Sequence, residues 1–239
     1  LAQTDGDAAR LRLAGARNVQ VLGNLKFDMT PSPDLLARGA AWRASAGRGV
    51  VQAAVTREGE EAPLLEAWRA VTEPRPLLLL VPRHPQRFDE VAGLVARAGF
   101  SLSRRSSWSD APPPEALQAD VWLGDSLGEM PAYYAAANVA LLGGSFAPLG
   151  GQNLIESAAC GCALVMGPHT FNFAQAAEGA LQAGAALRAP DLPSAVQRAL
   201  ELLSSGQATV MGEHGLDFAA QHRGASVRMA AAVMALIPR

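Results

Sequence analysis

The chain has 239 residues, of which 49% are hydrophobic, and its 20 basic and 22 acidic residues give a formal net charge of -2. This length buries a substantial core as one large domain or two small ones, and no basic excess or basic run indicates a nucleic-acid surface. No apolar run approaches the roughly 20 residues that a membrane-spanning helix needs, and no signal peptide is visible.

Short apolar runs alternate along the chain with longer segments whose apolar residues recur near the 3.6-residue helical period. Runs without in-out alternation are expected for strands whose two faces are both covered. This β, α order predicts an α/β fold with a Rossmann-like, doubly wound parallel sheet. The predicted strands are 19–22, 50–55, 77–81, 121–123, 139–142 and 163–166, and the predicted helices are 34–46, 58–71, 88–98, 130–137, 154–159, 171–183, 193–203 and 207–236.

We interpret residues 1–239 as one domain that ends in helices from about residue 190. The segment 106–116 contains three consecutive prolines, which predict a surface excursion without helix or central strand. Cys160 and Cys162 are too close in sequence for an unstrained disulfide, so we expect buried, reduced thiols. Because the chain lacks an initiator Met and its first strong motif comes some twenty residues in, we expect a fragment of a longer protein.

The most unusual stretch is glycine-rich and follows the predicted strand 139–142, with four glycines between residues 143 and 151. Glycines let the backbone approach a ligand, and the helix that follows offers amide groups and a positive dipole end to an anion. The pattern predicts a phosphate seat, with Gln152 or Asn153 at the helix start and Glu156 accepting hydrogen bonds from sugar hydroxyls. A flexible loop with a helix cap explains the same residues equally well.

A second candidate lies directly after the apolar strand 77–81, where Arg83 and His84 stand between two prolines. Rigid cationic groups at a strand exit suit a phosphate or a carboxylate. The alternative is a surface arginine and a capping histidine. The acids of "TREGEE", residues 56–61, fit the start of any helix because of its dipole. No GxGxxG or GxxxxGK[ST] motif occurs in the required context, so dinucleotide and P-loop functions lose support.

Taken together in order and spacing, the strand exits resemble one family. The motifs are "GNLKFD", "EGEE", "PRHPQRF", "GDSLGEM", "GGSFAPLGGQN" followed by Glu156, and "MGPHTFNF". They resemble the carboxyl-terminal half of 3-deoxy-D-manno-octulosonic acid (Kdo) transferases, from about Val19 to at least Phe173. The resemblance implies the donor-binding half of a two-domain GT-B glycosyltransferase, which uses CMP-Kdo without a nicotinamide or an essential metal.

The resemblance also implies what this chain lacks. The family transfers Kdo to the lipid A precursor of lipopolysaccharide at the cytoplasmic face of the bacterial inner membrane. Its catalytic base, acceptor site and membrane anchor belong to an amino-terminal domain, which we expect to be absent here. We therefore predict a soluble fragment without a catalytic residue, which binds CMP or CMP-Kdo weakly and transfers nothing.

Family-like roles fall on the matching residues. The resemblance places Arg83 and the 143–145 turn at the CMP phosphate, the 151–153 amides beside them, Glu156 at the ribose, and residues 124–130 at the cytosine. The full set of candidate donor-site residues is Arg83, His84, Gly124, Gly128, Met130, Gly143, Gly144, Ser145, Gly151, Gln152, Asn153 and Glu156, with Lys26, Glu60 and His169 toward the cleft or the Kdo.

The chain departs from the family pattern at two places. Val55, Thr56 and Arg57 stand where similar sequences often have Ser-Thr-His, which weakens the expectation of a histidine contact with the donor. Gln152 stands where a histidine often follows the double glycine, and it still donates and accepts hydrogen bonds.

Three alternatives stay open. The chain could be the donor-binding half of another GT-B enzyme, a UDP-sugar transferase or epimerase, since the glycine turn and the ribose carboxylate recur across that fold. A non-catalytic nucleotide-binding module is the second. A nicotinamide-dependent dehydrogenase is a poor third, because the glycine fingerprint is missing.

Overall fold

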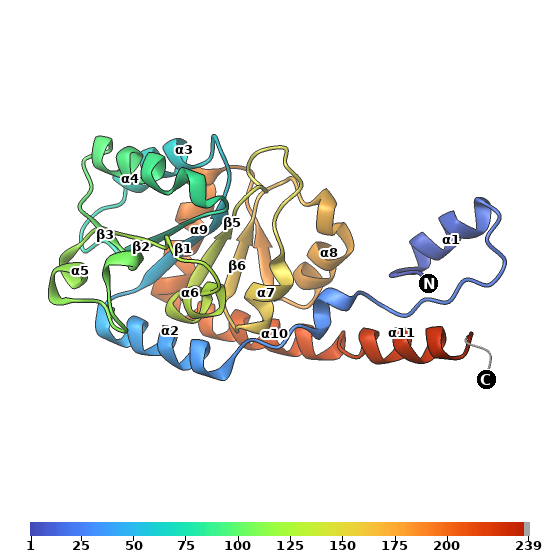
Figure 1. The fold of residues 1–239 in the computed structure, drawn as a ribbon. Helices are drawn as coiled ribbons and strands as arrows, with labels where there is room; N and C mark the ends of the chain where they lie inside the picture. The colour runs from blue at the N-terminus through green and yellow to red at the C-terminus, as the bar shows by residue number, and fades with distance from the viewer. Residues whose placement is uncertain (237–239) are drawn as a thin grey trace.

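In a computed structural model that describes residues 1–236, the chain forms a seven-stranded parallel sheet with helices on both faces (Figure 1). The strand order is β3-β4-β2-β1-β5-β6-β7, so the chain starts in the centre, builds one side and returns to build the other. The predicted doubly wound α/β class is confirmed. The strands are β1 Val50–Thr56, β2 Leu77–Pro82, β3 Leu102–Arg104, β4 Val121–Leu123, β5 Val139–Leu142, β6 Ala163–Met166 and β7 Ala186–Arg188.

The two faces of the sheet make separate cores, because successive side chains of a strand point in opposite directions. In β1, Val50 and Ala54 belong to one core, whereas Val51 and Ala53 belong to the other. The first core is covered by α2 Pro33–Ala46, α6 Met130–Ala136, α7 Leu154–Ala159, α8 Ala174–Gln182 and the last part of α10 Gln207–Gln221, whose first part contributes to the second core. The second is covered by α3 Glu61–Arg69, α4 Phe88–Arg97 and α9 Leu192–Ser205.

The predicted strand 19–22 is wrong. Val21 makes one isolated bridge to Ala2, outside the sheet, and the two sheet edges are occupied by β3 and β7. Neither edge strand was predicted from the sequence, because each has only three residues and includes an arginine.

The prediction that segment 106–116 is a surface excursion without helix is also wrong. Its last proline, Pro114, occupies the first turn of α5 Pro114–Gln118, a position where the missing N–H costs nothing. Trp108 is buried, and its ring lies edge-on to those of Trp42 and Trp122, with centroids 5.7 Å and 4.8 Å away. The segment therefore closes the first core instead of leaving the domain.

The predicted helical region 207–236 is divided at Gly224 into α10 and α11 Ala225–Met234. Asp28, at the end of the short helix η1 Leu25–Asp28, accepts hydrogen bonds from the amides of residues 224–226 and so fixes the start of α11. Figure 1 shows α11 and α1 Asp5–Leu13 at the end of the molecule opposite β3. The remaining short helices are η2 Pro85–Arg87, η3 Arg105–Ser107 and η4 Phe171–Phe173.

Two further sequence expectations concern helices and thiols. Within residues 1–236, no helix combines the length and the apolar character that crossing a bilayer requires. Both cysteines are free; Cys162 is buried and burial raises its pKa to about 12, while Cys160 is half-buried.

Candidate functional site

Three strand exits meet in the middle of the sheet. Ala54 of β1 is paired with Val81 of β2 on one side and with Leu142 of β5 on the other. Beyond these pairs, the Arg83 amide donates to the Thr56 carbonyl at 2.9 Å, and a similar bond joins the start of the glycine-rich segment to β1. The chain reverses its direction of winding here, where open α/β sheets bind ligands.

The glycine loop, residues 143–151, folds back on itself at the β5 exit. The Gly151 amide donates to the Gly144 carbonyl at 2.8 Å, and the Gln152 amide to the Gly143 carbonyl at 3.1 Å. Gly144 and Gly151 have φ angles of 68° and 75°, in the left-handed region that favours glycine. A Cβ atom on Gly143 would overlap the carbonyl group of Val55. The bare backbone therefore serves the internal packing of the loop as well as any ligand.

Ser145 lies inside this loop and is fully buried. Its hydroxyl donates to the Leu142 carbonyl and accepts from the Gly167 amide at 2.8 Å, and its carbonyl accepts from the His169 amide at 3.0 Å. The sequence placed Ser145 at the phosphate. The structure instead uses its hydroxyl to join the exits of β5 and β6, which also brings the half-buried His169 beside the glycine loop.

Glu60 also points inward. Its side chain is buried, with 3% of the residue exposed. The carboxylate accepts hydrogen bonds from the amides of Gly144 at 2.7 Å, Phe146 at 3.2 Å and Ala147 at 3.3 Å, and from that of Arg57 at 2.9 Å. The expectation that Glu60 faces the cleft or the sugar does not agree with this geometry, because its oxygens are already bonded to the loop.

Glu156 and Arg83 are oriented differently. Glu156 is half-buried in the first turn of α7, and its carboxylate has no hydrogen-bond partner within residues 1–236. Burial raises the pKa of Glu156, and the positive charge of Arg83 acts in the opposite direction. Arg83 is exposed, and its guanidinium forms no ion pair within the described part of the chain. An acid and a cation without a hydrogen-bond or ion-pair partner among the described residues thus lie close enough, beside the glycine loop, for their charges to interact.

The remaining candidates are spread more widely. Gly124 packs against Val81 and Tyr133, and Gly128 and Met130 follow it at the β4 exit. The strands β2 and β1 lie between this exit and the glycine loop, so these residues neighbour the β2 exit. His84 is exposed beside Arg83, at the start of η2.

Lys26 lies apart from the central exits. It belongs to η1, outside the sheet, and its ammonium group is 4.0 Å from the centre of the Phe173 ring. The structure thus brings Lys26 to η4, which follows the β6 exit. Asn153 caps α7 by accepting from the Ile155 amide at 3.2 Å.

Sequence reasoning missed two residues of the β1 exit. Arg57 is half-buried, the stem of its side chain lies next to Gly144, and its guanidinium has no partner among the described residues. Glu61 is buried and accepts from the Thr56 hydroxyl at 2.8 Å and from Arg87 at 2.7 and 3.1 Å. The signal for Arg57 was the one used for Arg83, a cation directly after an apolar strand.

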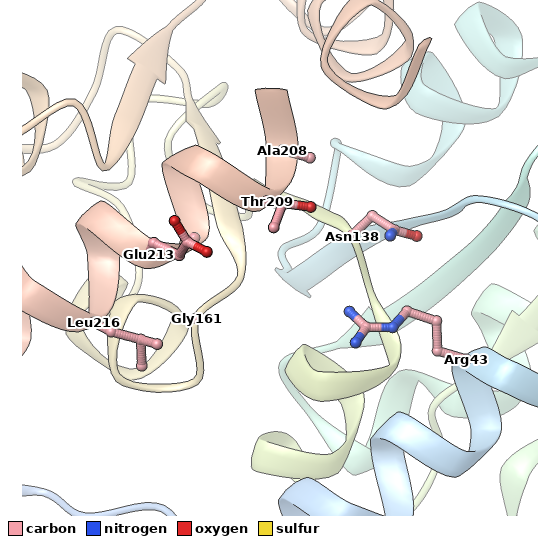
Figure 2. A pocket seen from close by; sticks show the side chains of 8 residues that line it. Arg43, Asn138, Gly161, Ala208, Thr209, Glu213 and Leu216 are labelled. Carbon is pink, nitrogen blue, oxygen red and sulfur yellow. The ribbon is translucent and has the colours of Figure 1, made fainter. Parts of the chain in front are cut away.

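A cavity of about 230 Å³ lies at the amino-terminal ends of the strands, and so at the opposite end of the sheet from the glycine loop (Figure 2). Arg43 and Asn138 line one side of it, and Glu213 and Leu216 of α10 line the other. It contains none of the predicted donor-site residues. In the part of the chain that the structure describes, no group of three or more His, Cys, Asp or Glu residues is arranged to hold a metal ion.

Comparison with known structures defines the class. No family model matches the chain. The Anabaena protein Alr3699/HepE, solved with UDP and glucose, has the same fold, with a TM-score of 0.62 and 15% identity over 99% of this chain and 62% of that one. The fold is that of GT-B glycosyltransferases.

A more specific likeness is to the C-terminal CMP-Kdo binding domain of WaaA from Acinetobacter baumannii, with a TM-score of 0.70 and 29% identity over 78% of this chain and 98% of that one. The 3-deoxy-D-manno-octulosonic acid transferase of Bordetella pertussis is 56% identical over 83% of this chain and 47% of its own length. The 3-deoxy-D-manno-octulosonic acid transferase of Haemophilus influenzae is 35% identical over 76% of this chain and 42% of its own length. The chain belongs to the Kdo transferase family, and it spans about half the length of these relatives.

Proposed function

We propose that this chain is the donor-binding part of a Kdo transferase and that the residues at the exits of β1, β2 and β5 bind the CMP group of CMP-Kdo. The similarity to the CMP-Kdo binding domain of WaaA supports the choice of donor. The observation that carries the assignment is that Glu156 and Arg83, two oppositely charged side chains without a hydrogen bond or ion pair among the described residues, lie near each other beside the glycine loop.

The two side chains match the two ends of a nucleotide's ribose phosphate. The carboxylate of Glu156 accepts hydrogen bonds only, so it suits the ribose hydroxyl donors, and partial burial strengthens such bonds. The guanidinium of Arg83 donates only, and a charge-assisted bond to phosphate contributes about 1.5 to 3 kcal/mol. Arg57, from the neighbouring strand exit, supplies a second cation.

Backbone amides contribute less than the sequence suggests. The amides of Gly144, Gly151 and Gln152 already donate within the protein. The Asn153 amide has no acceptor within the described residues. We therefore assign most of the affinity for phosphate to arginine side chains and, among residues 151–153, to the amide of Asn153.

In the proposed reaction, an acceptor hydroxyl attacks the anomeric carbon of Kdo, the bond from that carbon to the phosphate oxygen breaks, and CMP leaves with the charge. Arg83 and Arg57 stabilise the charge that develops on the departing phosphate. We assign no residue of this chain as the base that takes the acceptor proton. The lipid A precursor, the base and membrane association are proposed to belong to other parts of the full-length enzyme, and this chain alone to bind without transfer.

A nucleotide titration tests the proposal. We expect CMP to bind with a dissociation constant in the millimolar range or below by calorimetry or ligand-observed NMR, and UMP and UDP to bind more weakly. An absence of CMP binding at millimolar concentration would contradict it. Tighter binding of UDP than of CMP would instead favour a UDP-sugar enzyme on the same fold.

A further inference from the structure

The glycine loop contains a group of backbone amides that point at one place, as in an anion-binding nest. The amides of Gly144, Phe146 and Ala147 converge there, but the place is taken by the carboxylate of Glu60. An internal anion thus occupies the position where the sequence predicted a phosphate.

We propose that Glu60 is a positioning residue, which holds the glycine loop in its donor-binding shape and keeps the donor phosphate out of this nest. The inference rests on the proposed function, because it concerns the same strand exits. Under it, the phosphate meets the arginine side chains in front of the loop, not the amides of residues 144–147.

The division of bonds between the two oxygens of Glu60 supports this role. Oε2 accepts from Gly144 at 2.7 Å and from Arg57 at 2.9 Å, which joins the β5 exit to the β1 exit. Oε1 accepts from Phe146 and Ala147, farther along the loop. No cationic side chain of the described residues pairs with Glu60, so these four amide bonds are what compensates its charge. Four such bonds satisfy a buried carboxylate that would otherwise be costly.

Glu61, the residue after Glu60, connects the exit of β1 to the exit of β2. Glu61 accepts from Thr56 at the end of β1 and, through both oxygens, from Arg87 of η2 after β2. Because Glu60 and Glu61 are adjacent, the start of α3 fixes the exits of β1, β2 and β5 relative to one another. Arg83 lies between β2 and Arg87 and is therefore held in register with the glycine loop.

A donor phosphate could enter the nest only if Glu60 left it. Two anions at one set of amides repel each other, and Glu60 is buried, with 3% of the residue exposed. The geometry therefore separates the two anions, with the carboxylate behind the loop and the phosphate in front of it.

Amide hydrogen exchange of the wild-type chain, followed by NMR, tests the arrangement without any nucleotide. We expect the amides of Gly144, Phe146 and Ala147 to be protected although they lie in a loop, and their protection to be unchanged by saturating CMP. Free exchange of these amides, or protection that appears only with CMP, would overturn the proposal. This readout does not depend on CMP binding, so it separates the proposal from the proposed function.

The variant Glu60→Gln tests the positioning role on binding. Glutamine has one acceptor oxygen, and its NH2 group faces amides that also donate, so we expect CMP affinity to fall at least 10-fold. Glu60→Asp keeps the charge but is one methylene shorter, and we expect a smaller loss. If Glu60→Gln does not fold, hydrogen exchange of the wild-type chain still tests whether Glu60 occupies the nest.

Asp28→Asn is the matched control, since Asp28 is also a carboxylate that accepts from several backbone amides, those of residues 224–226, and none of its bonds reach the glycine loop. We expect it to lower the melting temperature and to leave CMP affinity within twofold of wild type. Unchanged affinity of Glu60→Gln, or a loss in both variants in proportion to their melting temperatures, would show that Glu60 acts on stability alone.

Discussion

The amino-terminal and carboxyl-terminal ends of the central strands differ in whether all of their charged side chains have partners within the protein. At the amino-terminal edge, Arg43 donates to the Ala137 carbonyl, Arg48 to the Ala119 carbonyl, and Asn138 accepts from the Val50 amide. At the carboxyl-terminal edge, Arg83 and Glu156 have no such partner within residues 1–236. The side chains named at the amino-terminal end complete the backbone, whereas Arg83 and Glu156 at the carboxyl-terminal end are available, although Glu60 and Glu61 beside them are bonded to the protein.

A cavity is therefore a poorer guide to function here than polar side chains that have no bonding partner within the protein. The cavity at the amino-terminal edge (Figure 2) is lined by side chains such as Arg43 and Asn138, which already bond to the protein. The carboxyl-terminal ends of the strands offer a cation, Arg83, and an acid, Glu156, that have no hydrogen-bond or ion-pair partner among residues 1–236. Four experiments test this contrast.

The largest effect is expected from adding one methyl group at each end of the central strands, in two separate variants. In Gly143→Ala, the Cβ would overlap the Val55 carbonyl, which belongs to the backbone and cannot move aside. We expect overpacking to cost about 1 to 3 kcal/mol and to abolish CMP binding. In Gly212→Ala, the Cβ would overlap the Gly161 carbonyl beside the opposite cavity. That variant should lose similar stability but keep its CMP affinity, measured by thermal melting and calorimetry; a loss of affinity there would erase the contrast.

Arginine truncation gives the next effect. Arg83→Ala should weaken CMP binding about 10- to 100-fold, because a charge-assisted bond of about 1.5 to 3 kcal/mol is lost, and should leave the melting temperature unchanged. Arg43→Ala should do the reverse, since it leaves the Ala137 carbonyl with only the weak bond from the Cys162 thiol and touches no donor-site residue. Calorimetric titration and melting of both variants check the prediction, and equal effects of the two on CMP affinity would contradict it.

Glu156→Gln should raise the stability of the folded chain and weaken CMP binding. Burial raises the pKa of Glu156 above its ordinary value of 4.5, so the folded state holds the proton more tightly than the unfolded state. The resulting stability is complete below pH 4.5 and is lost as the pH rises through the raised pKa. We expect the variant to melt higher than wild type at pH 7, by about 2 to 4 °C for each kcal/mol gained, and to bind CMP more weakly.

The pH dependence supplies the control for that variant. Melting curves recorded from pH 4.5 to pH 8 should coincide at the acidic end and separate as the pH rises. A separation that is larger at the acidic end would show that the carboxylate is stabilised, not destabilised, by its surroundings.

The smallest effect is expected at Val55. It has φ 59°, where a β-branched side chain is strained by about 1 to 2 kcal/mol, and it is half-buried. In Val55→Gly, relief of that strain should offset the lost packing and the extra chain entropy, for a net change within about 1 kcal/mol. Val51→Gly, at a fully buried position of the same strand with no such strain, should lose more than about 2 kcal/mol. Chemical denaturation measures both, and similar losses would mean that Val55 is not strained.

The fold was largely predictable because its signals are local. Runs such as 77–81 and 139–142 read as strands buried on both faces, and the helix 154–159 matches α7. The edge strands escaped because three residues carry no detectable period. The segment 106–116 was misinterpreted because the burial of Trp108 depends on Trp42 and Trp122, which neighbour it only after folding.

The candidate site was predictable in place but not in orientation. The order of the strand exits indicated where the glycine loop, Arg83 and Glu156 would gather. The directions of Glu60 and Ser145 depend on bonds to residues 84 and 22 positions away, Gly144 and Gly167. No pattern within either motif contains that information, so both side chains were assigned to the ligand although they bond to the protein.

The tryptophan cluster has a practical consequence for all of these measurements. Trp42, Trp108 and Trp122 are buried and mutually close, and Trp108 touches both of the others edge-on. Neighbouring indoles in fixed geometry couple their electronic transitions, so the near-ultraviolet circular dichroism of this chain should report the packing of the first core. The signal should vanish on melting and stay constant when a nucleotide binds, which makes it an internal optical standard for judging whether a variant that has lost its ligand has kept its fold.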